Sequence, residues 1–187
     1  MTRMLVFVFA CASVYTFLRY VIFGNVLPEN LPVYLLNKSV SMTSVVCLLF
    51  TAIYFTKKKL DKVKFWGRAS LHSAYIHIIL SLSILSKEYY PKFFGLEKMN
   101  LTGEITILFG VLAAYCYWLI SHTSEDFMHK ILQILSSALI VGHLIAMGFN
   151  GWLRIEGWHG GLPPISLISF VLATISLILF SRTKFVT

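Results

Sequence analysis

The chain is poor in charged residues, above all in acidic ones. Only 13% of its 187 residues are charged, and 8 Asp and Glu stand against 16 Lys and Arg. A soluble domain carries about 25% charged residues, so this composition excludes an ordinary soluble globular fold. Apolar residues instead make up 57% of the chain, and the mean hydropathy is +0.76.

Cysteine is scarce as well. Cys11, Cys47 and Cys116 all fall inside apolar runs, and no two of them form a C-x-x-C pair. This spacing suggests neither a disulfide framework nor a thiol-based metal site. We interpret the three as buried structural thiols.

The long apolar runs have the length needed to cross a bilayer, which is about 20 residues for a helix. Only helices or closed barrels satisfy their backbone groups in lipid, and these runs are too long and too uniformly apolar for barrel strands. We therefore predict an all-α integral membrane protein, with residues 1–187 forming a single transmembrane domain. This six-transmembrane-helix bundle has its helices at about 4–23, 33–56, 66–86, 103–121, 127–149 and 163–181.

Lysine and arginine predict the orientation, because cytoplasmic loops are enriched in them. The loop after the second span is the most basic part of the chain, with Lys57, Lys58, Lys59, Lys62 and Lys64. Counting spans outward from it puts both termini in the cytoplasm, on the same side as this loop. The net charge of +8 thus fits membrane topology, and we expect no nucleic-acid partner.

Two histidines are expected at one depth in the membrane. His77 lies 13 residues beyond Lys64, roughly 20 Å up its helix, and His143 lies 16 beyond Phe127, roughly 24 Å up. Both helices run outward, so the two imidazoles can ligate a haem iron axially inside a bundle. Small residues nearby predict a slot for a flat macrocycle: Ala74, Ser136, Ser137, Ala138 and Gly142.

A second haem has weaker support. His129 and His143 are 14 residues apart, which places them within about 40° on one helix face and roughly 21 Å apart along it. The equivalent partner position, 14 residues before His77, is Val63, which cannot ligate iron. His72 is the only substitute, about 140° around the helix from His77. We predict one haem, and that His129 is not an axial ligand of a stoichiometric second one.

Polar residues near the outer ends of the first two spans allow two readings. In the first, haem propionates or a quinone headgroup pair with Arg19, Asn37 and Lys38. In the second, the long side chains of Arg19 and Lys38 snorkel to the membrane interface. The histidines also allow a different function. In a haem-free membrane scaffold or small transporter they would be structural or would relay protons.

Four motifs, "WGRASLHSAYIH", "GEITILFGVLAAYCYWLISHTS", "HKILQILSSALIVGH" and "GLPPISLISF", resemble the ferric reductase-like transmembrane domain family. The likeness covers about residues 33–180. It is greatest to short six-helix members such as the haem-binding membrane subunits of bacterial periplasmic methionine-sulfoxide reductase systems. The family has a glycine ten residues before its third-helix haem histidine, as Gly67 precedes His77. Its fifth helix carries a pair spaced like His129 and His143.

The resemblance implies b-type haem between His77 and His143, electron transfer across a bacterial inner membrane, and a role as the electron-transfer subunit of an oxidoreductase. Larger members append flavin and nicotinamide domains, and we expect none here because the sequence has no G-x-G-x-x-G motif. A redox partner protein or a quinol must then supply electrons, with a flavin or quinone meeting the protein at its inner face.

The predicted orientation can be tested with a single cysteine in place of Lys58, after serine replaces the three native cysteines. Because Lys58 lies in the most basic loop, a membrane-impermeant maleimide should label this cysteine only after the membrane is permeabilised. Labelling from outside intact cells would contradict the predicted orientation.

Overall fold

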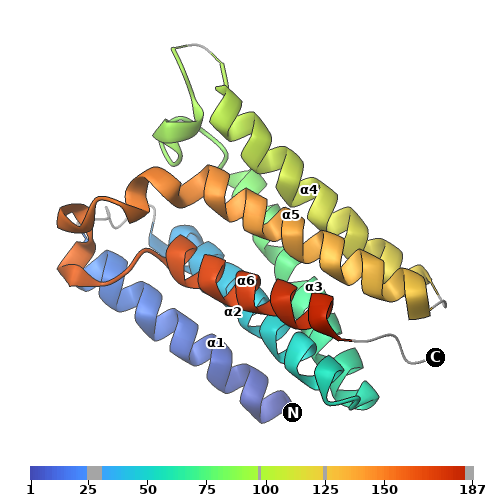
Figure 1. Ribbon diagram of the computed structural model, residues 1–187. Coiled ribbons are helices and arrows are strands. Elements are labelled where there is room, and N and C mark those ends of the chain that lie inside the picture. Colours follow the sequence, from blue (N-terminus) through green and yellow to red (C-terminus); the bar gives the residue numbers. More distant parts are fainter. Residues whose placement is uncertain (25–30, 97, 124–125, 184–187) are drawn as a thin grey trace.

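The computed structural model describes residues 1–24, 31–96, 98–123 and 126–183. Six long helices within these ranges confirm the predicted all-helical architecture (Figure 1). The first, α1 (Thr2–Phe17), continues directly into a π-helical turn, η1 (Leu18–Ile22). The others are α2 (Leu31–Thr56), α3 (Leu60–Ser83), α4 (Leu101–His122), α5 (Asp126–Trp152) and α6 (Ile165–Arg182).

Five described helical segments are long and apolar enough to cross a membrane, as expected of an integral membrane protein. They are Thr2–Ile22, Leu31–Thr56, Leu101–His122, Phe127–Trp152 and His159–Arg182. The remaining long helix, α3, has 24 residues but is less apolar. Its N-terminal part carries the charged residues Asp61, Lys62, Lys64 and Arg68.

The predicted boundaries were wrong for the third helix. The basic stretch after α2 was expected to be a loop up to residue 65, but α3 begins at Leu60 and ends at Ser83 rather than at 86. Lysine is a good helix former, so Lys62 and Lys64 join the first turns of α3. The connection needs only 57–59, where Lys58 takes a left-handed backbone conformation with φ of 53°.

The helices pack unevenly, and this leaves a space inside the bundle. Extensive contacts join α2 to α3 and to α6, and α5 to α4 and to α6, while α1 packs against α2. In contrast, α3 meets α4 only sparsely. The sequence therefore folds into two helix pairs, α2–α3 and α4–α5, that separate on one side of the molecule.

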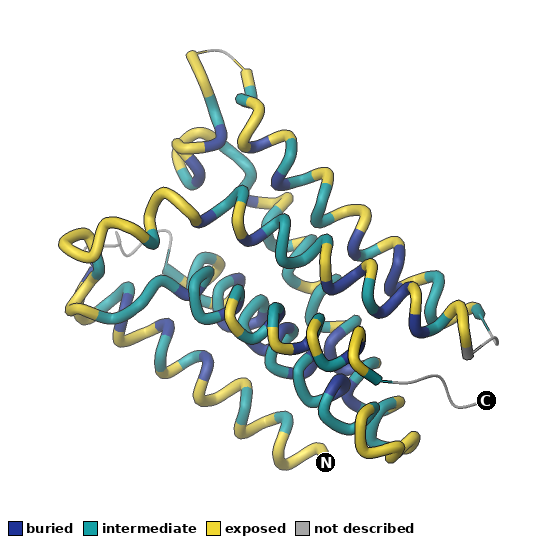
Figure 2. Tube along the Cα trace, in the orientation of Figure 1, coloured by how far each residue is buried: buried dark blue, intermediate teal, exposed yellow. Residues whose placement is uncertain are grey.

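Small hydroxyl side chains hold the α2–α3 pair together. The Ser44 hydroxyl donates to the Ser70 backbone carbonyl, and the Ser70 hydroxyl donates to the Ser44 carbonyl, each at 2.9 Å. Such exchanges let helix backbones approach closely in a membrane, where apolar burial gives no net drive between helices. The outward faces carry exposed apolar residues instead (Figure 2). Phe7 and Ile79, for example, are both 67% exposed, as suits contact with lipid.

The two ends of the bundle differ. The start of α1, the short α2–α3 turn and the end of α6 lie at one end (Figure 1). At the other end, the α3–α4 loop carries a short helix, η3 (Pro91–Phe93), and the α5–α6 loop carries η4 (Ile155–Gly157) and η5 (His159–Gly161). The basic turn at 57–59 therefore lies at the end opposite these longer loops.

Replacing Ser70 by leucine should destabilise the α2–α3 contact. Ser70 is 1% exposed, and a larger side chain in a packed site typically costs about 1–3 kcal/mol. We expect the thermal unfolding midpoint in detergent to fall. Ser83→Leu is the matched control on the same helix, because Ser83 is exposed and bonds only the carbonyl of Leu80. Equal midpoints for the two variants would contradict this view of the packing.

Candidate functional site

A cavity of about 880 Å³ lies in the space between the two helix pairs. Its volume is within the range of about 300–1,000 Å³ that small-molecule and cofactor pockets occupy. Side chains from η1, α2, α3, α4, α5, α6 and the α3–α4 loop line it. Among them are four residues predicted from the sequence to form a site: Arg19, Lys38, His77 and His143.

His77 enters the cavity from α3 with one ring nitrogen fixed. Its Nδ1 lies 2.5 Å from Oδ1 of Asn37, a fully buried residue of α2. An amide oxygen only accepts hydrogen bonds, so Nδ1 carries the proton and donates. A neutral imidazole has one N–H, and Nε2 of His77 is therefore the nitrogen that keeps a free lone pair.

His143 enters from α5 and is held in the same way by a different acceptor. Its Nδ1 lies 2.7 Å from the backbone carbonyl oxygen of Thr106 on α4, so this nitrogen also donates and Nε2 keeps the lone pair. Gly110 provides the room, because a Cβ at this position would lie 3.2 Å from Nδ1 of His143. The ring thus packs against the α4 backbone where a side chain is missing.

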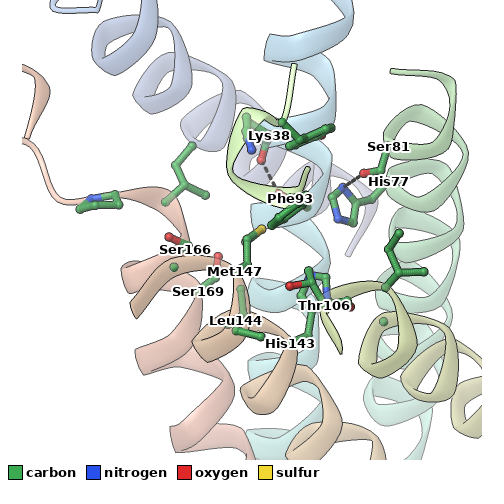
Figure 3. A pocket seen from close by; sticks show the side chains of 18 of the residues that line it. Lys38, His77, Ser81, Phe93, Thr106, His143, Leu144, Met147, Ser166 and Ser169 are labelled. Carbon is green, nitrogen blue, oxygen red and sulfur yellow. Dashed lines mark hydrogen bonds between the residues drawn. The ribbon is translucent and has the colours of Figure 1, made fainter. Parts of the chain in front are cut away.

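Figure 3 shows the two rings pointing from α3 and from α5 toward the same space. An imidazole whose Nδ1–H is bound to a carbonyl or amide oxygen has a fixed tautomer and a more basic Nε2. This arrangement is typical of histidines that ligate a metal. Elsewhere among the described residues, no group of three or more His, Cys, Asp or Glu side chains could hold a metal ion.

The end of the cavity that lies against the α3–α4 and α5–α6 loops is cationic. Arg19, Lys38 and Lys92 line it, and none of the lining residues that the structure describes is acidic. Arg19 is 4% exposed and donates to the Leu162 carbonyl, while its Nε is buried without a partner. Arg19 is thus buried against the α5–α6 loop, and its pairing with a cofactor stays a prediction. An anionic group in the cavity would meet these cations and no opposing carboxylate.

The α3–α4 loop covers the cavity on the same side. Tyr90 and Phe93 stack with ring centroids 5.4 Å apart and are 8% and 4% exposed. Phe93 contacts Met147 of α5 (Figure 3), and Nζ of Lys38 lies 5.6 Å from the Tyr90 ring centroid. Burial raises the pKa of the Tyr90 phenol, which keeps this hydroxyl protonated.

The other intramembrane histidines do not line this cavity. His72 is exposed on α3. His129 is half-buried on α5, and its Nε2 has no hydrogen-bond partner. The same is true of Oε1 of Gln133, one turn further along the helix. His77 and His143 thus share a cavity in which the proposed second pair has no part.

The two remaining histidines lie at helix ends or in loops. His122 was expected in a loop but is the last residue of α4, where its Nδ1 lies 2.9 Å from the Trp118 carbonyl. His159 belongs to η5 and its ring is 6.1 Å from that of Tyr20. Both side chains are exposed.

The predicted slot of small residues was only partly right. Ala74 lines the cavity, but Ser136 and Ser137 are buried elsewhere and Ala138 is exposed. Gly142 packs against Phe109, since a Cβ there would lie 2.8 Å from that ring. Three small residues of α4 that the prediction did not name, Gly110, Ala113 and Ala114, also line the cavity.

The glycine carried over from the family resemblance has no steric role at the cavity. A Cβ on Gly67 would make only an ordinary contact of 3.8 Å with Thr51 of α2. The glycine that makes room for a cavity histidine is Gly110, which sequence reasoning missed. Its position inside a helical run could have identified it. Glycine there lowers helix stability by about 1 kcal/mol relative to alanine, which suggests that close packing requires it.

No protein-family model matches the chain, and a comparison with curated proteins finds no match.

Placing valine at Gly110 should displace the ring of His143. The added Cβ alone would come within 3.2 Å of Nδ1, and the two methyl groups add further bulk. We expect the bond to Thr106 to break, which ¹⁵N spectra of histidine-labelled protein would detect as a changed tautomer of His143. Gly151→Val on α5 is the control, because a Cβ there meets nothing within 4 Å. Unchanged His143 resonances in Gly110→Val would contradict this geometry.

Proposed function

We propose that this protein is a membrane cytochrome that binds one b-type haem between His77 and His143 and passes electrons across the membrane. The observation that carries the proposal is that both imidazoles are protonated at Nδ1 and line the same cavity. Each donates its Nδ1–H to a fixed oxygen, and each lines one cavity between helices. Two such rings would hold the iron of an electron-transfer haem.

The rest of the cavity suits such a group. Carboxylate side groups of a porphyrin would find Arg19, Lys38 and Lys92 at one end, and an apolar macrocycle would find side chains such as Ile107, Ile140 and Leu144 along the walls. The haem, when bound, supplies one-electron redox chemistry. The chain's own part is to bind it, to orient both imidazoles and to set the polarity around it. Two histidine ligands leave no open iron position, which favours electron transfer over oxygen binding.

The orientation follows from the basic end of the bundle. We place both termini and the Lys57–Lys59 turn in the cytoplasm. This topology requires α3 to cross the membrane together with the five more apolar helices. His77 is six residues before the end of α3 at Ser83, or roughly 9 Å from that end. The haem then lies toward the outer leaflet of a bacterial inner membrane. A redox partner protein or a quinol would supply its electrons, and His129 marks the inner end of α5, where a donor flavin or quinone would meet the protein.

Single substitutions of the two axial histidines test the assignment. His77→Ala and His143→Ala should each abolish the low-spin absorption spectrum of the purified protein, because each removes one of two iron ligands. The spectrum is recorded in detergent, oxidised and then reduced with dithionite.

His159→Ala and His129→Ala are the matched controls, since neither residue lines the cavity. Both should keep the wild-type spectrum. A normal low-spin spectrum in His77→Ala or His143→Ala would overturn the ligand assignment. A folded wild-type chain that takes up no haem would instead support a haem-free scaffold or small transporter.

A further inference from the structure

The side chain of Asn37 connects His77 to the loop that covers the cavity. Its Oδ1 accepts from Nδ1–H of His77 at 2.5 Å and from the Ser81 hydroxyl at 3.2 Å. Its Nδ2 donates to the Tyr90 hydroxyl at 2.9 Å. Asn37 is 0% exposed, so water cannot replace these partners. The amide therefore contacts α3 with its oxygen and the outer loop with its nitrogen.

We propose that Asn37 is a positioning residue that fixes His77 in the Nδ1–H tautomer and thereby tunes the redox potential of the bound haem. The tautomer is a property of the chain alone. The effect on redox potential rests on the proposed function.

The two imidazoles differ in how their acceptors can be changed. His143 donates to a backbone carbonyl, which no side-chain substitution removes. His77 donates to a side-chain amide, which a substitution can delete or charge. The Asn37–His77 bond is thus the one whose acceptor a substitution can replace.

The sign of the expected effect follows from the donor strength of Nε2. A stronger acceptor at Nδ1–H makes the imidazole more basic, which stabilises the more positive, oxidised iron and lowers the redox potential. Aspartate at position 37 keeps the shape of asparagine and adds a negative charge. Lys38, Lys92 and Arg19 line the same cavity and would support that charge. Valine keeps the approximate volume and removes the acceptor.

The tautomer can be read in the full chain purified without haem. The ¹⁵N spectrum of histidine-labelled protein distinguishes a protonated Nδ1 from a protonated Nε2, and comparison with His77→Gln identifies the His77 signals. We expect wild type to show the Nδ1–H form and Asn37→Val to show a mixture of tautomers. A protonated Nε2 in the wild type, as a reversed amide would require, overturns the proposal.

The redox potential is measured by spectroelectrochemical titration of haem-loaded protein. Asn37→Asp should shift the midpoint to lower potential and Asn37→Val to higher potential. Tyr90→Phe is the control, because it removes the partner of Nδ2 and leaves the Oδ1 bond to His77. Its midpoint should shift less than that of Asn37→Val.

These outcomes separate the inference from the proposed function. Equal shifts in Asn37→Val and Tyr90→Phe would mean that Asn37 only packs the loop, and would overturn the inference while haem binding stands. If Asn37→Val does not fold, the shift in the isosteric Asn37→Asp still decides, and an unchanged midpoint there contradicts the inference. If wild type binds no haem, the proposed function fails and the ¹⁵N spectrum alone decides the tautomer.

Discussion

The hydrogen bonds from Nδ1 of His77 and His143 decide what the cavity can do. An imidazole buried among helices must place its N–H somewhere, because an unsatisfied polar group away from water is costly. Here both N–H groups donate to oxygens beside the cavity. The Nε2 atom of each ring therefore keeps a lone pair that can bind a ligand. A haem site here would depend on this one constraint more than on the cavity's size.

Helix packing provides the space that these rings share. The α2–α3 pair is joined by reciprocal serine bonds, and α4 packs closely on α5. The sparse contact between α3 and α4 leaves His77 and His143 on helices that face each other across a gap. Polar residues such as Asn37 and Ser70 are buried in the bundle, while apolar residues such as Phe7 and Ile79 are exposed.

Composition and run length predicted the helical class and most helix boundaries, because lipid permits few backbone solutions. Helical periodicity also brought His77 and His143 to one depth, and the structure places both on one cavity. Which faces of α4 and α5 meet could not be predicted, since α4 is apolar nearly all round. The small residues were consequently assigned to α5, whereas Gly110 of α4 makes room for His143. Lys92 was missed because a cation in a loop gives no sign that the loop folds inward.

The most direct test of the account is the haem content of wild-type protein purified in detergent, by pyridine haemochrome assay with an absorption spectrum of the same sample. We predict about one b-type haem per chain, with the low-spin spectrum that two imidazole ligands give. A folded chain without haem, or a high-spin spectrum, would contradict the central claim. A content of about two haems per chain would contradict the single site between His77 and His143.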